Sequence, residues 1–178
     1  MKPQKQTTAQ GCLRVACTSP LQTMSVGRMI GRVLPAASVI ALSGPLGAGK
    51  TTLVKGIADG LGIDPDRVNS PTFVLMKEYH GRQSLFHADL YRLDALRDIV
   101  LLGLDDYLER DGVLVVEWAG KAPELLPAER LAVDIQVGAG QQRRITIRAH
   151  GATYRNVVGR LEKKCSRPAG RGQIAGAA

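Results

Sequence analysis

The segment from residue 38 to residue 62 constrains the fold of this chain more than any other. An apolar run, SVIALS, leads directly into GPLGAGKT (residues 44–51), and apolar side chains then recur at helical spacing, at Leu53, Val54, Ile57 and Leu61. The run GPLGAGKT matches every fixed position of the phosphate-binding motif G-x-x-x-x-G-K-[ST]. A buried strand before the motif and an amphipathic helix after it predict a strand–loop–helix unit of an α/β sheet.

This loop predicts a site for a nucleoside triphosphate and Mg²⁺. Its backbone N–H groups would turn toward phosphate oxygens, and the helix that begins near Lys50 would direct its positive dipole end at the same anion. Lys50 would reach the β- and γ-phosphates, and the Thr51 hydroxyl would bind Mg²⁺. The predicted nucleotide-binding residues of the loop are Gly47, Ala48, Gly49, Lys50, Thr51 and Thr52.

A carboxylate, Glu117, ends the apolar run VLVVE (residues 113–117). A residue at the carboxyl end of a buried strand faces the nucleotide crevice of an open α/β sheet. Glu117 could therefore bind Mg²⁺ directly or through water, or orient the attacking water. The alternative is a surface glutamate at a strand end.

A second carboxylate, Asp89, lies in FHADLYR (residues 86–92) and shares one side of its strand with His87 and Tyr91 by alternation. Asp89 could support the Mg²⁺ site or orient a water molecule. A structural salt bridge to Arg92 or Arg97 explains it equally well. The pattern favours His87 as a core histidine rather than a ligand.

The segment VNSPTF (residues 68–73) follows the loop by about 20 residues, and it offers two hydroxyl groups beside a proline. In phosphate-binding-loop proteins, a segment at this place can respond to the γ-phosphate as a switch. A plain connection into the next strand remains the alternative.

The rest of the chain alternates strand and helix patterns. We predict strands at 13–17, 112–118, 130–137 and 143–150, a hairpin within 72–93 that turns at His80-Gly81, and a helical stretch after residue 95 that breaks near Gly103. This order predicts an α/β, P-loop NTPase-like domain of three layers with a central mixed, mostly parallel sheet. The domain would span residues 13–162, between a flexible N-terminal tail (1–12) and a disordered basic, Gly/Ala-rich tail (163–178).

The net charge of +8 belongs to the ends of the chain. Residues 20–150 hold equal numbers of basic and acidic groups, so the main body of the chain is neutral. The basic ends could attract RNA or remain solvated. Three cysteines without paired spacing fit a reducing compartment, and the sequence has no apolar run of the length that a membrane span needs. We expect a cytoplasmic protein.

Taken together, the motifs resemble one family, TsaE, the small ATPase of bacterial tRNA threonylcarbamoyladenosine synthesis. The resemblance covers about residues 13–150, and its order and spacing are more specific than any single motif. It is carried by GPLGAGKTT (44–52), NSPTF (69–73), HADLYRL (87–93), LGLDDYL (102–108) and VEWAGK (116–121).

The resemblance implies slow hydrolysis of ATP with Mg²⁺, and docking on the partner proteins TsaD and TsaB, through which tRNA is contacted indirectly. The family ATPase is not itself the transferase. Lys50 and Thr51 match the loop's phosphate and Mg²⁺ groups, and Asp89 matches a functionally needed aspartate. Glu117 matches the metal-associated glutamate, and Trp118 the tryptophan expected near the nucleotide. The resemblance thus implies Lys50, Asp89 and Glu117 as catalytic residues.

One position departs from the family pattern: Pro45 stands where many members have an acidic residue. Proline has no backbone N–H, yet that position need not contact phosphate. A rival hypothesis is a stand-alone small-molecule P-loop kinase, which needs an acceptor pocket and usually an arginine-bearing lid. The apolar and acidic stretch 96–110 is a poor candidate for such a lid.

Overall fold

The structure, a computed structural model, describes residues 4–7 and 11–166. Its strands are β1 Gln4–Thr7, β2 Cys12–Cys17, β3 Ser38–Ser43, β4 Met76–Tyr79, β5 Leu85–Asp89, β6 Val113–Glu117, β7 Arg130–Val137 and β8 Arg143–His150. The α-helices are α1 Pro20–Gly31, α2 Lys50–Gly60, α3 Leu96–Val100, α4 Leu104–Leu108 and α5 Ala152–Ser166. Three short 3-10 helices complete the fold: η1 Pro65–Arg67, η2 Ala119–Lys121 and η3 Pro123–Leu125.

All the described strands form one sheet in the order β1-β2-β8-β7-β3-β6-β5-β4. The four central strands, β7, β3, β6 and β5, are parallel to one another, whereas β4 at one edge and β8, β2 and β1 at the other pair in antiparallel fashion. The predicted mixed sheet with a parallel centre is therefore confirmed. Strand β1 was not predicted, because its sequence, QKQT, is polar throughout.

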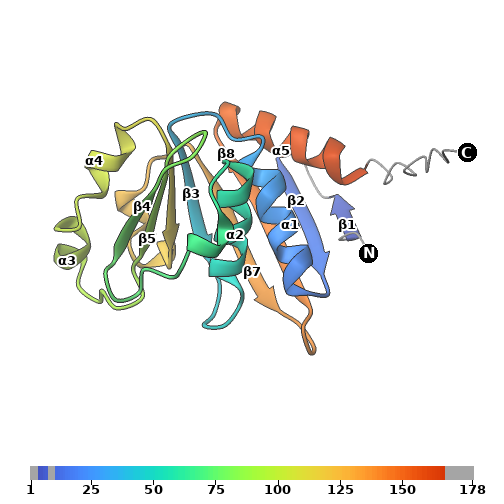
Figure 1. Cartoon of the computed structure of the whole chain (residues 1–178), viewed down its shortest axis with the longest axis horizontal. Helices are drawn as coiled ribbons and strands as arrows, with labels where there is room; N and C mark the ends of the chain where they lie inside the picture. Colours follow the sequence, from blue (N-terminus) through green and yellow to red (C-terminus); the bar gives the residue numbers. More distant parts are fainter. Residues whose placement is uncertain (1–3, 8–10, 167–178) are drawn as a thin grey trace, which may run out of the picture.

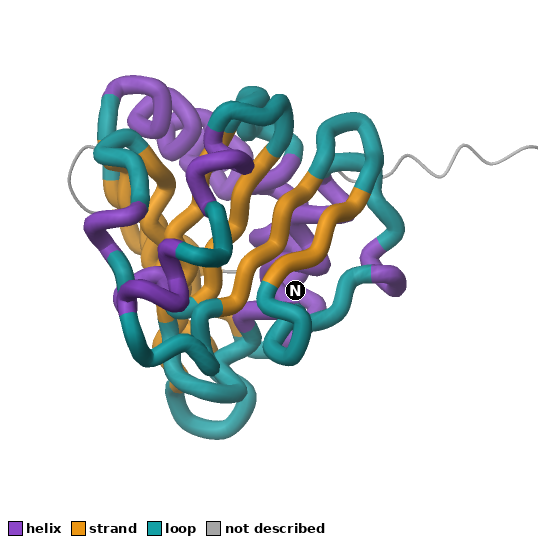
Figure 2. Tube along the Cα trace, turned by 90° about the vertical axis from the view of Figure 1, so that its left-hand side faces the viewer, coloured by secondary structure: helices purple, strands orange, loops and turns teal. Residues whose placement is uncertain are grey.

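Helices cover the two faces of the sheet unequally (Figures 1 and 2). Helices α1, α2 and α5 pack on one face, where their apolar side chains share a core with β2, β3, β7 and β8. The opposite face carries α3, α4 and the segment 119–126, whose core partners are residues of β3, β5 and β6 and the partly buried Met76 of β4. The predicted break at Gly103 separates α3 from α4, and the predicted alternation of β5 places Leu85 and Phe86 in different cores.

Helix α2, which carries the phosphate-binding loop at its N-terminus, packs against α1 at unusually short range. A Cβ atom on Gly27 of α1 would lie 2.2 Å from the Leu53 carbonyl oxygen, and one on Gly56 of α2 would lie 2.1 Å from the Met24 carbonyl oxygen. Gly31 and Gly60 repeat this arrangement one turn later. A Cβ atom on Gly31 would lie 2.2 Å from the Ile57 carbonyl oxygen, and one on Gly60 would lie 2.5 Å from the Arg28 carbonyl oxygen. The two helix backbones are therefore in direct contact, and only glycine fits between them.

We predict that Gly56→Ala destabilises the protein by about 1–3 kcal/mol, because the added methyl group must separate the two helices. Gly159→Ala in α5 is a matched control, since a Cβ atom there meets no atom within 4 Å. That control should be neutral or stabilise by up to about 1 kcal/mol through helix propensity. Denaturant unfolding measures both, and equal effects of the two substitutions would contradict the predicted backbone contact.

Candidate functional site

The phosphate-binding loop connects β3 to α2 through one tight turn. The Ala48 N–H donates to the Pro45 carbonyl at 3.2 Å, and Gly47 has φ of 71°, the left-handed conformation that glycine adopts at the third position of a type II turn. Pro45 takes part through its carbonyl oxygen, so the loop closes without an N–H at that position. Gly44 is also required, because a Cβ atom there would lie 2.6 Å from the Ile135 carbonyl oxygen.

Lys50 lies inside this loop and is only 5% exposed. Its ammonium donates to the carbonyl oxygens of Gly44 and Pro45, each at 3.0 Å, and lies 4.2 Å from the centre of the Trp118 ring. Burial lowers the pKa of the Lys50 ammonium, and the negative charges of Glu117 and Asp89 oppose that shift. An ammonium has three N–H donors, so one more donor can be directed to a phosphate oxygen.

Glu117 is buried at the end of β6, with 2% exposure, which excludes the surface glutamate considered from the sequence. Its Oε1 atom accepts from the Thr51 hydroxyl at 3.3 Å and lies 2.9 Å from Nε2 of His87. The His87 ring is fully buried, and its Nδ1 atom has no hydrogen-bond partner among the described residues. His87 therefore serves in the core as a support for Glu117.

Asp89 ends β5, the neighbour of β6, and is 2% exposed. Its Oδ2 atom accepts from the hydroxyls of Thr72 at 2.6 Å and Ser70 at 3.2 Å, and its Oδ1 atom accepts from the Tyr91 N–H at 2.9 Å. The proposed salt bridge with Arg92 or Arg97 is wrong. Among the described residues, Arg97 pairs with Asp98 at 3.6 Å, and Arg92 lies over the Phe73 ring at 5.1 Å.

Trp118 follows Glu117 and turns the chain away from the sheet. Its φ of 59° is uncommon for a residue with a side chain, and its ring lies 5.1 Å from that of Tyr91. The Lys121 ammonium donates to the Tyr91 carbonyl at 2.6 Å, to the Leu93 carbonyl at 3.0 Å and to the Asp94 carboxylate at 2.9 Å. The segments that follow the two carboxylates therefore hold each other in place.

A cavity of about 330 Å³ lies between the loop and the two carboxylates. Every predicted site residue lines it: Gly47, Ala48, Gly49, Lys50, Thr51, Thr52, Asp89, Glu117 and Trp118. Leu46, Ser70, Thr72 and Tyr91 complete the wall. The structure thus brings the predicted residues together, while their individual roles remain predictions.

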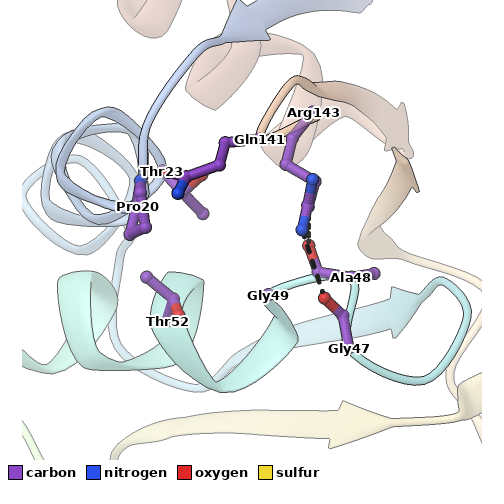
Figure 3. Close-up of a pocket in the computed structure, with 8 residues that line it drawn as sticks. All are labelled: Pro20, Thr23, Gly47, Ala48, Gly49, Thr52, Gln141 and Arg143. Carbon is purple, nitrogen blue, oxygen red and sulfur yellow. Dashed lines mark hydrogen bonds between the residues drawn. The ribbon is translucent and has the colours of Figure 1, made fainter. Parts of the chain in front are cut away.

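A second cavity of about 310 Å³ adjoins the first at the loop, and Figure 3 shows the residues that line it. Gly47, Ala48, Gly49 and Thr52 line both cavities, and Pro20, Thr23, Gln141 and Arg143 line the second one alone. The Arg143 guanidinium donates to the Ala48 carbonyl at 2.9 Å and to the Gly47 carbonyl at 3.4 Å. The β7–β8 hairpin is thereby fastened to the loop.

Arg143 and Gln141 were not predicted as site residues. A signal for them exists in the topology, because β7 runs parallel to β3, so the turn after β7 must emerge at the same edge of the sheet as the loop. The sequence alone does not show that β7 pairs with β3. This pairing is what brings Arg143 next to Ala48.

Comparison with known proteins identifies the family to which the chain belongs. The family model of Threonylcarbamoyl adenosine biosynthesis protein TsaE matches residues 17–145. The tRNA threonylcarbamoyladenosine biosynthesis protein TsaE of Treponema pallidum is 40% identical over 135 residues, which cover 76% of this chain and 99% of that protein. This chain belongs to the TsaE family.

Two further proteins extend the match. The TsaE protein of Bacillus subtilis is 40% identical over 153 residues, which cover 85% of this chain and 94% of that protein. The crystal structure of Bacillus subtilis YdiB superposes with a TM-score of 0.73 at 33% identity, covering 89% of this chain and 99% of the other. The family resemblance and the P-loop-like fold predicted from the sequence are confirmed.

The side chains around the first cavity fit a Mg²⁺ ion that is bound together with phosphate. Mg²⁺ prefers oxygen ligands and usually takes one or two from the protein and others from phosphate and water. The Thr51 hydroxyl and the Glu117 carboxylate provide two such oxygens, 3.3 Å apart.

Within residues 4–7 and 11–166, no helix has the length and apolar character needed to cross a membrane.

We predict that Lys50→Ala weakens ATP binding by about tenfold or more, because the loop loses a charged donor to phosphate. The chain has a single tryptophan, Trp118, whose ring lies beside Lys50, so its fluorescence can follow a titration with ATP; calorimetry provides a second measurement.

Lys55→Ala is the matched control, because Lys55 lies on the same helix but does not line either cavity beside the loop. Unchanged ATP affinity in the Lys50 variant would contradict the assignment of this residue to the phosphates.

Proposed function

We propose that this TsaE-family protein is a Mg²⁺-dependent ATPase that serves tRNA threonylcarbamoyladenosine synthesis together with the TsaD and TsaB proteins. One observation carries the proposal: a loop cation, a loop hydroxyl and two buried carboxylates line the same cavity. The relatives of Treponema pallidum and Bacillus subtilis are named for tRNA threonylcarbamoyladenosine biosynthesis, which supports the biological role.

In this proposal the two cavities divide the ATP molecule between them. The first has the cation and the carboxylates, and would hold the triphosphate. The second is lined by Thr23, Gln141 and other residues without a carboxylate, and would hold the nucleoside. The loop residues Gly47, Ala48, Gly49 and Thr52 border both cavities, as the α- and β-phosphates would require.

The side chains have separate tasks. Lys50 neutralises the charge that accumulates on the phosphate oxygens. Thr51 and Glu117 would hold Mg²⁺, which supplies electrostatic stabilisation to the transferred phosphoryl group. Asp89 lies on the adjacent strand with its Oδ2 atom on the NSPTF hydroxyls, and it orients the attacking water. Trp118 contacts the nucleotide beside Lys50.

The NSPTF segment acts as a switch in this scheme. Ser70 and Thr72 line the cavity and donate to Asp89 at the same time. A γ-phosphate that accepts hydrogen bonds from these hydroxyls would compete with Asp89 for them. Binding of the γ-phosphate would therefore change the number of hydrogen bonds that the Asp89 carboxylate accepts. The exposed side chains beside them, Phe73 at 85% and Val74 at 59%, would present this change at the surface.

The alternative, a stand-alone small-molecule kinase, has less support. Helices α3 and α4 would have to provide the lid, yet Ile99 and Leu104 anchor them in the core on one face of the sheet. If ATP and a panel of small acceptors gave a phosphorylated product without partner proteins, the ATPase proposal would be replaced by the kinase.

Asp89→Asn and Glu117→Gln should each reduce ATP hydrolysis by about a hundredfold, the usual scale for losing a positioned proton acceptor or a charge next to the reacting phosphate. Phosphate release at saturating ATP and Mg²⁺ measures the effect. Asp105→Asn and Glu124→Gln are the controls, because both side chains are exposed and neither lines the cavity. Full activity in both site variants would refute the assignment.

The biological role has its own test. Modification of tRNA is reconstituted from the four bacterial components, with and without this protein, under multiple turnover. We expect repeated turnover only when the protein is present and Lys50 is intact. Equal product in its absence would separate the ATPase from the tRNA pathway.

A further inference from the structure

On one half of the sheet, one face has no helix packed on it from the part of the chain that the structure describes. In β2, β7 and β8, alternate residues enter the core beneath α1, α2 and α5, among them Leu13, Val133 and Ile147. The residues between them point to the opposite side, where the second core includes no residue of these three strands. We call this surface the open sheet face; its basic side chains are Arg14, Arg130, Arg144, Arg148 and His150.

The open sheet face is strongly basic, although residues 20–150 are neutral as a whole. Arg14 pairs across the strands with Thr146, which places it diagonally between Arg144 and Arg148. Asp134 is the one acidic side chain among the outward positions of these strands. Among the described residues, none of the four arginines forms an ion pair.

Two further observations show that the charges act together. The pKa of His150 is lowered, first by burial and then by the positive charges of Arg130 and Arg148. A cavity of about 270 Å³ lies where the open sheet face meets the segment 119–126, and two arginines, Arg130 and Arg148, line it together with one carboxylate, Asp134. The surface therefore combines a positive field with a hollow in which an anion can be partly enclosed.

We propose that the open sheet face binds the phosphate backbone of structured RNA, the class of molecule that includes the tRNA for which the relatives are named. Arginine is suited to phosphate because its planar guanidinium can donate two parallel hydrogen bonds. Arg144 and Arg148 are four residues apart on one strand, about 13 Å at the usual rise of β-strands, so the face spans several phosphates.

The composition of the face distinguishes RNA backbone from other partners. It has no Phe, Tyr or Trp among its outward positions, whereas surfaces for single-stranded nucleic acid stack bases on aromatic rings. It also has no large apolar side chain there, although protein–protein interfaces have an apolar core. Double-stranded RNA is recognised mainly through phosphate and sugar contacts, which this surface can provide.

The test compares two double variants of the full chain that lose the same charge. Arg144→Gln with Arg148→Gln removes two arginines from the open sheet face, and neither residue lines the cavities around the phosphate-binding loop. The control, Arg32→Gln with Arg97→Gln, removes two exposed arginines outside the face. Both keep the basic chain ends. Binding of an unmodified tRNA transcript is measured by fluorescence anisotropy, without nucleotide, over a range of salt concentrations.

We expect the open-face variant to lose about tenfold or more in tRNA affinity near 0.1 M salt, and the slope of log affinity against log salt to fall by about two, one for each lost phosphate contact. The control should keep a tRNA affinity close to that of the unmodified protein.

Equal losses in both variants, or no loss in either, would overturn the proposal. So would a variant that keeps tRNA binding but no longer associates with TsaD and TsaB, since the face would then be a protein-docking surface. Because no nucleotide is present, failure here is distinguishable from failure of the ATPase proposal.

Discussion

The parallel pairing of β5, β6 and β3 is the constraint on which the site depends. In this register Asp89 is the direct partner of Glu117, and Glu117 is the partner of Leu42, one residue before the end of the strand that leads into the phosphate-binding loop. Both carboxylates and the loop therefore emerge at one edge without any side chain having to reach across the sheet. Antiparallel pairing at β5 would send Asp89 to the opposite edge and separate it from Lys50.

Bringing two carboxylates into a buried site has a cost that the surrounding residues must offset. Burial of an unpaired charge is unfavourable, and the protein meets this with a different set of donors for each group: Thr51 and His87 at Glu117, and hydroxyl and backbone groups at Asp89. Lys50 adds a positive charge whose own pKa is lowered by burial. A ligand with both negative phosphates and a cation would satisfy all of these groups at once.

Local patterns in the sequence were sufficient for most of the strands and helices and for the residues of the loop. Apolar alternation predicted β5, and the motif predicted the position of Lys50 at the start of α2, because both depend on neighbours within a few residues. The partners of Asp89 depend instead on how the segment 69–73 folds back over β5, and a nearby arginine in the sequence was therefore a poor guide. The contact of Arg143 with Ala48 joins residues 95 positions apart, and it follows from the strand order, which no local pattern contains. Strand β1 was missed for a related reason, since backbone pairing at a sheet edge does not require an apolar pattern.

Strand β8 links the two functional surfaces that the structure suggests. Successive residues of a strand point to opposite faces, so Arg143 can reach the phosphate-binding loop while Arg144, next to it, points to the open sheet face. The loop of the β7–β8 hairpin, residues 138–142, directly precedes Arg143 and lines the second cavity through Gln141. A molecule bound at Arg144 would therefore contact β8, the strand whose first residue, Arg143, is hydrogen-bonded to the phosphate-binding loop. Any shift of β8 would change the hydrogen bond between Arg143 and Ala48. Since linkage between two sites acts equally in both directions, a nucleotide that repositions the hairpin would change the affinity of the open sheet face by the same factor.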